Sequence, residues 1–231
     1  MKRFWKQVSV EPCEGGYRVT LDGGPIRTQG GQPQVVPMPA LAEALAEEWR
    51  RQAEEVDPKA FPLRDLADLA IDHVRRDRAG VIDKLMAYAE TDTLCYRADP
   101  DEPLYRRQLA LWEPFVAAFE KRLAVRLERV SGVIHRPQPP ETLARLREIL
   151  EQKDDFTLSA LSTLAPLAAS LLIALTAMEP GWDIGRLFEA ANCEQDWQAE
   201  QWGRDALAQE ARARRLAAFE AAAAFARLAR G

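Results

Sequence analysis

The pattern of hydrophobic and polar residues changes near residue 39. Before that point, short runs rich in Val, Thr and Tyr at 7–10, 17–21 and 26–28 are separated by the turn sequences EGG and DGG. Such runs between Gly-rich turns are typical of antiparallel strands. Glycines and prolines in the segment 30–39 then disfavour a helix until about Ala40. This part of the chain predicts a hairpin or small meander.

After residue 39 the apolar positions recur at helical spacing. One face of the first such segment carries Leu41, Leu45, Trp49, Gln52 and Val56. Further helical stripes follow within 66–74, 81–88 and 103–119, and a long helix is expected at 206–230. Pro114 should kink or divide the third of these. The alternating residues 124–130 are typical of a strand.

These patterns predict a mainly α member of the α+β class, with a small amino-terminal antiparallel β unit followed by a multihelical body. We place the β-rich unit at 1–38 and the helical domain at 39–231. A soft boundary is expected near 131–140, where the sequence contains three prolines.

The stretch 156–178 contains no charged side chain. Its length is close to the roughly 20 apolar residues that cross a bilayer, so a membrane-associated factor is one alternative. Several Ser and Thr residues, the internal Pro166 and the nearby Glu179 argue against a span. We favour a buried central helix and expect no membrane insertion.

Composition narrows the class of protein. The chain has 231 residues, of which 47% are hydrophobic and 29% charged, as expected for a globular protein. Its net charge of -5 argues against a nucleic-acid binder. The three cysteines are far apart in sequence and form no zinc or disulfide pattern, which favours a reducing compartment. We recognise no export signal at the amino terminus, so we expect the chain to be bacterial and cytoplasmic or already processed.

The sequence contains few side chains in arrangements typical of catalytic sites. The two histidines, His73 and His135, stand apart from any GxSxG, HExxH, phosphate-loop or dinucleotide motif. Carboxylate pairs one helical turn apart have no histidine nearby. We therefore predict no catalytic, metal or cofactor site. The alternative is a helical enzyme that uses carboxylates together with Tyr96 and Arg97.

The segment EQDWQAEQWGRD is the most distinctive part of the sequence. It should form one helix segment beside Gly203, with two of the six tryptophans of the chain and four carboxylates. Tryptophan is a common anchor in protein interfaces, and carboxylates beside it would select a basic or amide-rich partner. A partly buried amphipathic helix is the other interpretation. The candidate partner-binding residues are Glu194, Asp196, Trp197, Gln198, Glu200, Trp202 and Asp205.

Seven blocks along the chain resemble one family. In order they are LDGGPIRT, LAEALAEEWRRQ, FPLRDLADLAIDHV, TDTLCYRAD, LWEPF, AASLLIAL and DWQAEQWGRDA. Their order is similar to that of the Atp-twelve family, the assembly chaperones for the alpha subunit of the F-type ATP synthase. The resemblance covers nearly the whole chain. It implies a small β unit with a helical body, and neither catalysis nor a cofactor.

The resemblance also implies a partner and a role. A chaperone of this family would bind the free alpha subunit and shield its beta-facing surface during assembly of the catalytic head. We expect a monomer in the bacterial cytoplasm, with eukaryotic relatives in the mitochondrial matrix. The acidic carboxy-terminal segment would contact the partner, with Trp197 and Trp202 as inward anchors. Six further positions are taken as structural or family-motif residues: Trp49, Gln52, Asp72, Asp92, Tyr96 and Arg97.

Overall fold

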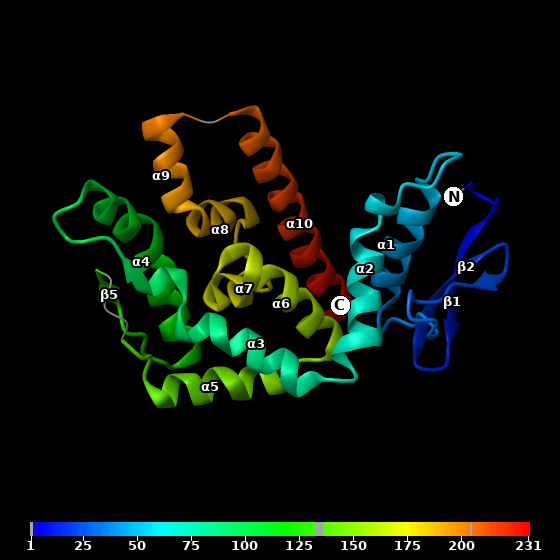
Figure 1. Ribbon diagram of the computed structural model, residues 1–231. Helices are drawn as coiled ribbons and strands as arrows, with labels where there is room; N and C mark the ends of the chain where they lie inside the picture. The colour runs from blue at the N-terminus through cyan, green and yellow to red at the C-terminus, as the bar shows by residue number, and fades with distance from the viewer. Residues whose placement is uncertain (1, 133–135, 204) are drawn as a thin grey trace. The chain divides into compact units, whose positions relative to one another are not determined.

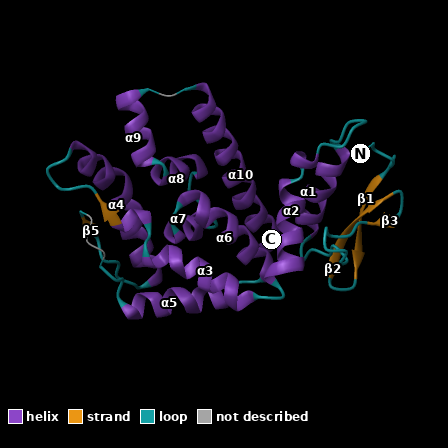
Figure 2. Ribbon diagram, viewed as in Figure 1, coloured by secondary structure: helices purple, strands orange, loops and turns teal. Residues whose placement is uncertain are grey.

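The protein is described here by a computed structural model that covers residues 2–132, 136–203 and 205–231 (Figure 1). Most of the described residues lie in helices (Figure 2), which confirms the predicted mainly helical α+β class. The strands are β1 (Val8–Cys13), β2 (Gly16–Leu21), β3 (Gly24–Pro25), β4 (Tyr96–Arg97) and β5 (Val130–Ser131). The α-helices are α1 (Pro39–Arg50), α2 (Pro62–Leu69), α3 (Arg78–Glu90), α4 (Pro103–Leu123), α5 (Pro140–Glu151), α6 (Asp155–Ala168), α7 (Leu171–Ala177), α8 (Ile184–Ala191), α9 (Cys193–Trp202) and α10 (Ala206–Arg230).

The chain divides into two compact units. The first comprises 1–78, 154–160 and 221–231, and the second comprises 79–153 and 161–220. The predicted division into a β-rich unit at 1–38 and a helical domain at 39–231 stays a prediction. The soft boundary expected near 131–140 includes residues 133–135, which lie outside the described ranges.

The first unit is built around an antiparallel sheet with the strand order β1, β2, β3. Val36 extends this sheet, because Tyr17 and Val36 exchange two backbone N–H to O=C hydrogen bonds of 2.9 Å each. Helix α1 contacts both β1 and β2 and buries Leu41 and Leu45, as the periodicity predicts. Pro39 begins this helix, where a missing backbone donor carries no cost.

Two buried aspartates hold the loop that follows β3. Asp72 accepts hydrogen bonds from the Thr28 hydroxyl at 2.8 Å and from the Gly30 N–H at 2.8 Å. Asp68, on α2, accepts from the Gln29 N–H at 3.0 Å. Asp72 lies in a short π-helix, Ala70–Val74, that continues from α2. The loop is thus anchored on the α2 segment by side chains that are about 40 residues away in sequence.

The second unit packs its helices around Trp112 of α4. This side chain is fully buried, and its indole N–H donates to the Ala190 carbonyl on α8 at 2.8 Å. Phe188 and Phe219 are also fully buried, with ring centroids 5.7 Å apart. Helix α4 is continuous through Pro114, so the predicted division of this helix is wrong. The kink expected at that position stays a prediction.

The uncharged stretch 156–178 forms two helices, α6 and α7, instead of the single central helix predicted. Ala169 adopts a left-handed conformation with a φ of 47°, which ends the first helix. Ser170 then begins the second by accepting the Ile173 N–H at 3.0 Å. In the described part of the chain, no helix combines the length and the apolar composition needed to cross a membrane.

The prediction of a strand at 124–130 is wrong except at the last residue, Val130. Only Val130, with Ser131, pairs with another strand, in parallel with β4. The preceding N–H groups donate to side chains: Leu127 to Glu120 at 2.7 Å and Glu128 to Gln138 at 2.9 Å. Because side chains satisfy these groups, the alternating residues need no neighbouring strand.

We predict that Gly16→Ala destabilises the first unit strongly. Gly16 has a φ of +146°, and an added Cβ would lie 2.2 Å from the Val36 carbonyl oxygen. The clash should separate Val36 from β2 and lower the free energy of unfolding by about 2 kcal/mol or more in urea denaturation. Gly23→Ala is the matched control, because Gly23 also has a positive φ but no atom within 4 Å of an added Cβ. Equal losses in the two variants would contradict the proposed clash.

Candidate functional site

The predicted partner-binding segment forms helix α9, which contacts α4 and α8 within the second unit. The helix ends at Trp202, because Gly203 has a φ of 87°. Asp205 therefore lies outside the helix that the sequence predicts to include it. Its carboxylate accepts the Ala208 N–H at 2.6 Å and caps the start of α10.

Glu194 supports a buried amide. Its Oε1 accepts a hydrogen bond from Nε2 of Gln108 at 2.8 Å, and Gln108 is fully buried in α4. The Gln108 Oε1 in turn accepts the Ala98 N–H at 2.8 Å. Reversing the charge of Glu194 would leave this buried donor without its acceptor, at a cost of about 1–3 kcal/mol. Such a variant would therefore perturb stability as well as any partner contact.

Two more carboxylates of α9 are paired with arginines. Asp196 is largely buried and accepts two hydrogen bonds from Arg212, at 3.0 and 2.8 Å. Glu200 accepts two from Arg107, at 2.5 and 2.8 Å. The guanidinium of Arg107 also lies 5.7 Å from the ring centroid of Trp197, which is half-buried. These paired charges attract a partner less than four free carboxylates would.

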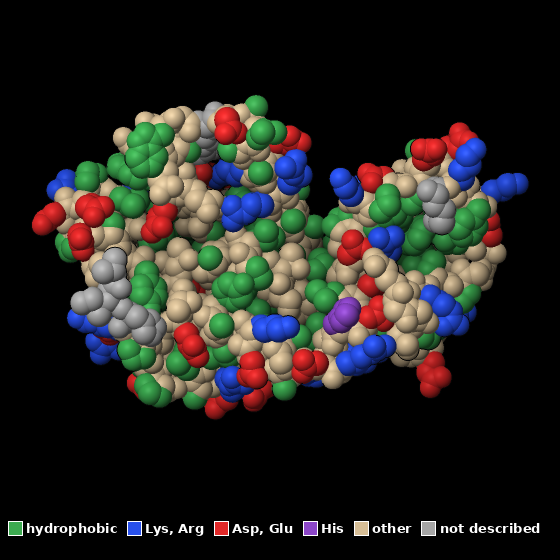
Figure 3. Space-filling view, in the orientation of Figure 1, with side chains coloured by type: hydrophobic (Ala, Val, Ile, Leu, Met, Phe, Trp, Pro, Cys, Tyr) green, Lys and Arg blue, Asp and Glu red, His purple; other side chains and the backbone are tan. Residues whose placement is uncertain are grey.

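Trp202 is the exception among the aromatic residues of the segment. Its side chain is 81% exposed, and Leu207 at the start of α10 is 77% exposed. Figure 3 shows hydrophobic side chains at the surface over the end of α9 and the start of α10. The expectation that Trp202 is an inward anchor is therefore wrong, because the side chain of this last residue of α9 is exposed to solvent. Gln198 is exposed as well, and no hydrogen bond from its side chain is found within the described ranges.

Two of the family-motif residues, Trp49 and Gln52, stabilise the first unit. The Trp49 ring lies 5.1 Å from that of Trp5 and 4.6 Å from that of Phe61, measured between centroids. Gln52 is buried, and its Oε1 accepts the Asp57 N–H at 2.9 Å just after α1. These contacts are those of residues that brace the fold.

Asp92 joins two distant segments of the second unit. It is fully buried and accepts hydrogen bonds from the Leu94 N–H at 3.1 Å, the Ser170 hydroxyl at 2.9 Å and the Leu172 N–H at 3.0 Å. Burial raises the pKa of its carboxyl to about 6, although the hydrogen bonds from Leu172, Ser170 and Leu94 oppose the shift. Asp92 therefore acts as a structural cap, and Asp72 has a comparable role in the first unit.

Arg97 is held in an ion-pair network. Its Nη2 donates to Glu113 at 2.6 Å, and Arg129 donates to the other oxygen of Glu113 at 2.7 Å. Burial favours a higher pKa for Glu113, but hydrogen bonds from the two arginines lower it overall. The neighbouring Tyr96 hydroxyl donates to the Arg136 carbonyl at 3.5 Å. The alternative that Tyr96 and Arg97 are catalytic gains no support from these contacts, because Arg97 is engaged in ion pairs.

Among the described residues, no group of three or more His, Cys, Asp or Glu side chains is arranged to hold a metal ion. His73 is exposed, and His135 lies outside the described ranges.

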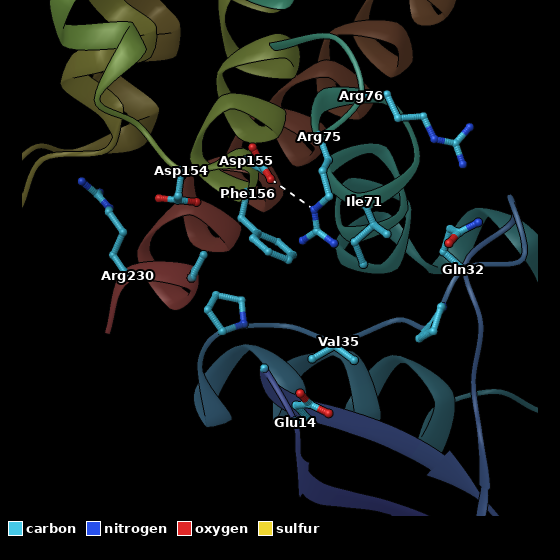
Figure 4. A pocket seen from close by; sticks show the side chains of 14 residues that line it. Glu14, Gln32, Val35, Ile71, Arg75, Arg76, Asp154, Asp155, Phe156 and Arg230 are labelled. Atoms are coloured by element: carbon cyan, nitrogen blue, oxygen red, sulfur yellow. Dashed lines mark hydrogen bonds and ion pairs between the residues drawn. The ribbon is translucent and has the colours of Figure 1, made fainter.

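Sequence reasoning missed the pocket in the first unit (Figure 4). It has a volume of about 860 Å³ and lies among the β1–β2 turn, the segment 32–37, the helix end at 71–76 and the first residues of α6. Phe156 and Ile71 give it an apolar wall, and Arg75 forms an ion pair with Asp155 at 3.3 Å. The only signal in the sequence is the motif PQVVP at 33–37, which is too short to predict a pocket.

The second unit contains a pocket of about 690 Å³ beside α4 and the start of α8. Its wall includes Phe115 and Trp182, whose ring centroids are 5.2 Å apart. The wall of this pocket and the exposed Trp202 are apolar and aromatic surfaces of the kind found in protein-binding sites.

Comparisons with known proteins specify the class further. Residues 2–120 match the profile of the ATP12 chaperone protein family. The chain is 25% identical over 214 residues to the mitochondrial protein atp12 of Schizosaccharomyces pombe, covering 87% of this chain and 74% of that protein. The crystal structure of Atp12 from Paracoccus denitrificans superimposes with a TM-score of 0.93 at 38% identity, covering 99% of this chain and 98% of that one. A point mutant of the same bacterial protein gives the same TM-score and identity.

The chain belongs to the ATP12 chaperone family, whose members are non-enzymatic factors in ATP synthase assembly. The resemblance predicted from the seven sequence blocks is thereby confirmed. Relatives occur both in bacteria and in mitochondria.

We predict that Asp92 makes stability depend on pH. Because its folded pKa, about 6, lies above the ordinary value of 3.8, the folded state binds the proton more tightly than the unfolded state. The stability contributed by this proton is complete below about pH 4 and is lost as the pH rises to about 6, with a total of roughly 3 kcal/mol. Urea denaturation at a series of pH values should show that Asp92→Asn removes this decline. The exposed Asp101→Asn is the control. An unchanged pH profile in Asp92→Asn would contradict the assignment.

Proposed function

We propose that the protein is a chaperone that binds the free alpha subunit of ATP synthase and shields the surface that later meets the beta subunit. The observation that supports this proposal most is Trp202, an 81% exposed tryptophan at the end of α9. Large exposed aromatic side chains are unfavourable in water, and tryptophan is enriched among residues that dominate binding energy. Because the chain belongs to a family of ATP synthase assembly chaperones, an ATP synthase subunit is the class of partner that we propose for this side chain.

The physical need for such a chaperone follows from assembly itself. A subunit surface that becomes buried between alpha and beta subunits is apolar and unpaired before they meet. Exposed apolar surface favours wrong association, so covering it keeps the alpha subunit available for assembly. Release would follow when the beta subunit competes for the same surface.

The seven candidate residues divide into two groups in this proposal. Trp202 and Gln198 contact the partner directly, since both are exposed. The rest hold the helix and its neighbouring elements in place or add charge at the edge of the contact: Glu194, Asp196, Trp197, Glu200 and Asp205. We further propose that the protein works as a monomer, in the cytoplasm of bacteria and, for its eukaryotic relatives, in the mitochondrial matrix.

Capture of the separately expressed alpha subunit tests the proposal. We expect Trp202→Ala to weaken capture about tenfold or more, because truncating a central interface tryptophan typically costs over 1 kcal/mol. The free energy of unfolding should change by less than about 0.5 kcal/mol, since the side chain is exposed. Affinity is measured by titrating labelled alpha subunit, and stability by urea denaturation.

Phe4→Ala provides the matched control, because Phe4 is an exposed aromatic residue, at 70%, in the first unit. It should leave the affinity for the alpha subunit unchanged. Undiminished capture by Trp202→Ala would rule out this contact surface. Failure of the unaltered protein to bind the alpha subunit would contradict the proposed function itself.

A further inference from the structure

The segment 33–37 of the first unit forms a short free edge of the sheet. Val36 uses its N–H and C=O to pair with Tyr17 of β2. Since successive residues of an extended segment point their backbone groups to opposite sides, those of Val35 point away from β2. Throughout the described ranges, neither group of Val35 has a hydrogen-bond partner. Pro33 and Pro37 flank this position and have no N–H of their own.

This edge is held rigidly before any partner arrives. The Gln34 side chain, which is buried, donates from Nε2 to Asp68 at 2.6 Å. Asp72 fixes the preceding turn through Thr28 and Gly30. Gly30 cannot be replaced easily, because an added Cβ would lie 2.7 Å from the Asp72 carboxylate. A fixed edge loses little conformational entropy on binding, which favours affinity.

The pocket of about 860 Å³ lies directly against this edge (Figure 4). Val35 lines it on one side, and Phe156 and Ile71 face Val35 from the other. Such a volume is typical of sites that bind small molecules or short peptide segments. The free N–H and C=O of Val35 can pair with the backbone of an added strand, and the apolar wall beside them can contact one of its side chains.

The charged residues of the pocket determine which charged side chains a bound strand can have. Asp155 is paired with Arg75 and Arg78, and Asp154 accepts the Thr157 N–H at 2.8 Å as a cap of α6. Two charged side chains of the lining have no partner among the described residues: Arg76 and Glu14. They lie on opposite sides of the pocket in Figure 4. A peptide with an acidic residue at one end and a basic residue at the other complements them.

We propose that this pocket binds an extended peptide segment of a partner protein, which adds as a strand at Val35 and places an apolar side chain against Phe156 and Ile71. An acidic side chain of the segment pairs with Arg76 and a basic one with Glu14. This site is separate from the contact at Trp202 and does not depend on the identity of the partner.

The probe is a fluorescein-labelled peptide with blocked termini and the sequence Lys-Val-Leu-Val-Asp, prepared also in the reverse order. Fluorescence polarisation with the full chain should show saturable binding of the peptide in one of its two sequence orders. The amide NMR signals of Val35, Ile71 and Arg76 should shift when that peptide is added. A peptide with Ser-Gly-Ser in place of Val-Leu-Val should bind at least about tenfold more weakly, because it lacks the apolar side chains. Absence of binding by both orders up to millimolar protein would overturn the proposal.

Two variants locate the site. Val35→Pro removes the backbone donor, and its ring also fixes φ and restricts the preceding Gln34. It should weaken binding about tenfold, whereas Val35→Ala keeps the N–H and should bind within roughly threefold of the unaltered protein. Arg76→Glu, on an exposed residue, should weaken binding roughly fivefold. A peptide with Lys in place of Asp should restore binding to the Arg76→Glu variant.

Arg227→Glu is the matched control for the charge change. Arg227 is exposed, belongs to the same unit and does not line the pocket. It should bind the peptide as the unaltered protein does. If Val35→Pro fails to fold, as judged by its thermal transition, Arg76→Glu and its charge-swapped peptide decide the outcome. Binding that neither Arg76→Glu nor a folded Val35→Pro weakens would place the peptide elsewhere and overturn the proposal.

Discussion

Carboxylates that accept backbone N–H groups from distant segments are the interaction on which this fold depends. A helix start leaves N–H groups without intrahelical partners, and a buried turn does the same. Here Glu48 of α1 accepts the Leu63 and Arg64 N–H groups at the start of α2, at 2.7 and 2.9 Å. Asp92 accepts the Leu172 N–H at the start of α7 in the same way. Each carboxylate thus positions an element far away in the sequence.

Burial also makes these carboxyl groups harder to ionise. It raises the pKa of Glu48 to about 7 and that of Asp92 to about 6, and it also raises the pKa of Asp68. A group that is this expensive to ionise is retained where its hydrogen bonds cannot be supplied otherwise. In this chain they specify the loop after β3, the start of α2 and the start of α7.

The carboxylates of helix α9 also accept hydrogen bonds from residues distant in sequence, but from side chains instead of backbone N–H groups. Its carboxylates are engaged with Gln108, Arg107 and Arg212, and they hold α9 against neighbouring elements. In the function proposed above, the exposed end of the helix at Trp202 is the part that contacts a partner. A segment that is strongly charged in sequence therefore also presents an exposed aromatic side chain in the structure.

The sequence alone determined the hairpin, most of the helices and the family. Glycine-bounded strands and the stripe with Leu41 and Leu45 depend on local periodicity, which one chain segment displays by itself. The sequence pattern predicts neither α5 nor α8, and it predicts a single helix in place of α6 and α7. Only the tertiary structure decided that Ala169 breaks the helix, that Glu194 supports Gln108, and that Val35 is a free edge beside a pocket. These features depend on hydrogen bonds and packing between residues that are distant in sequence, and no local pattern encodes such contacts.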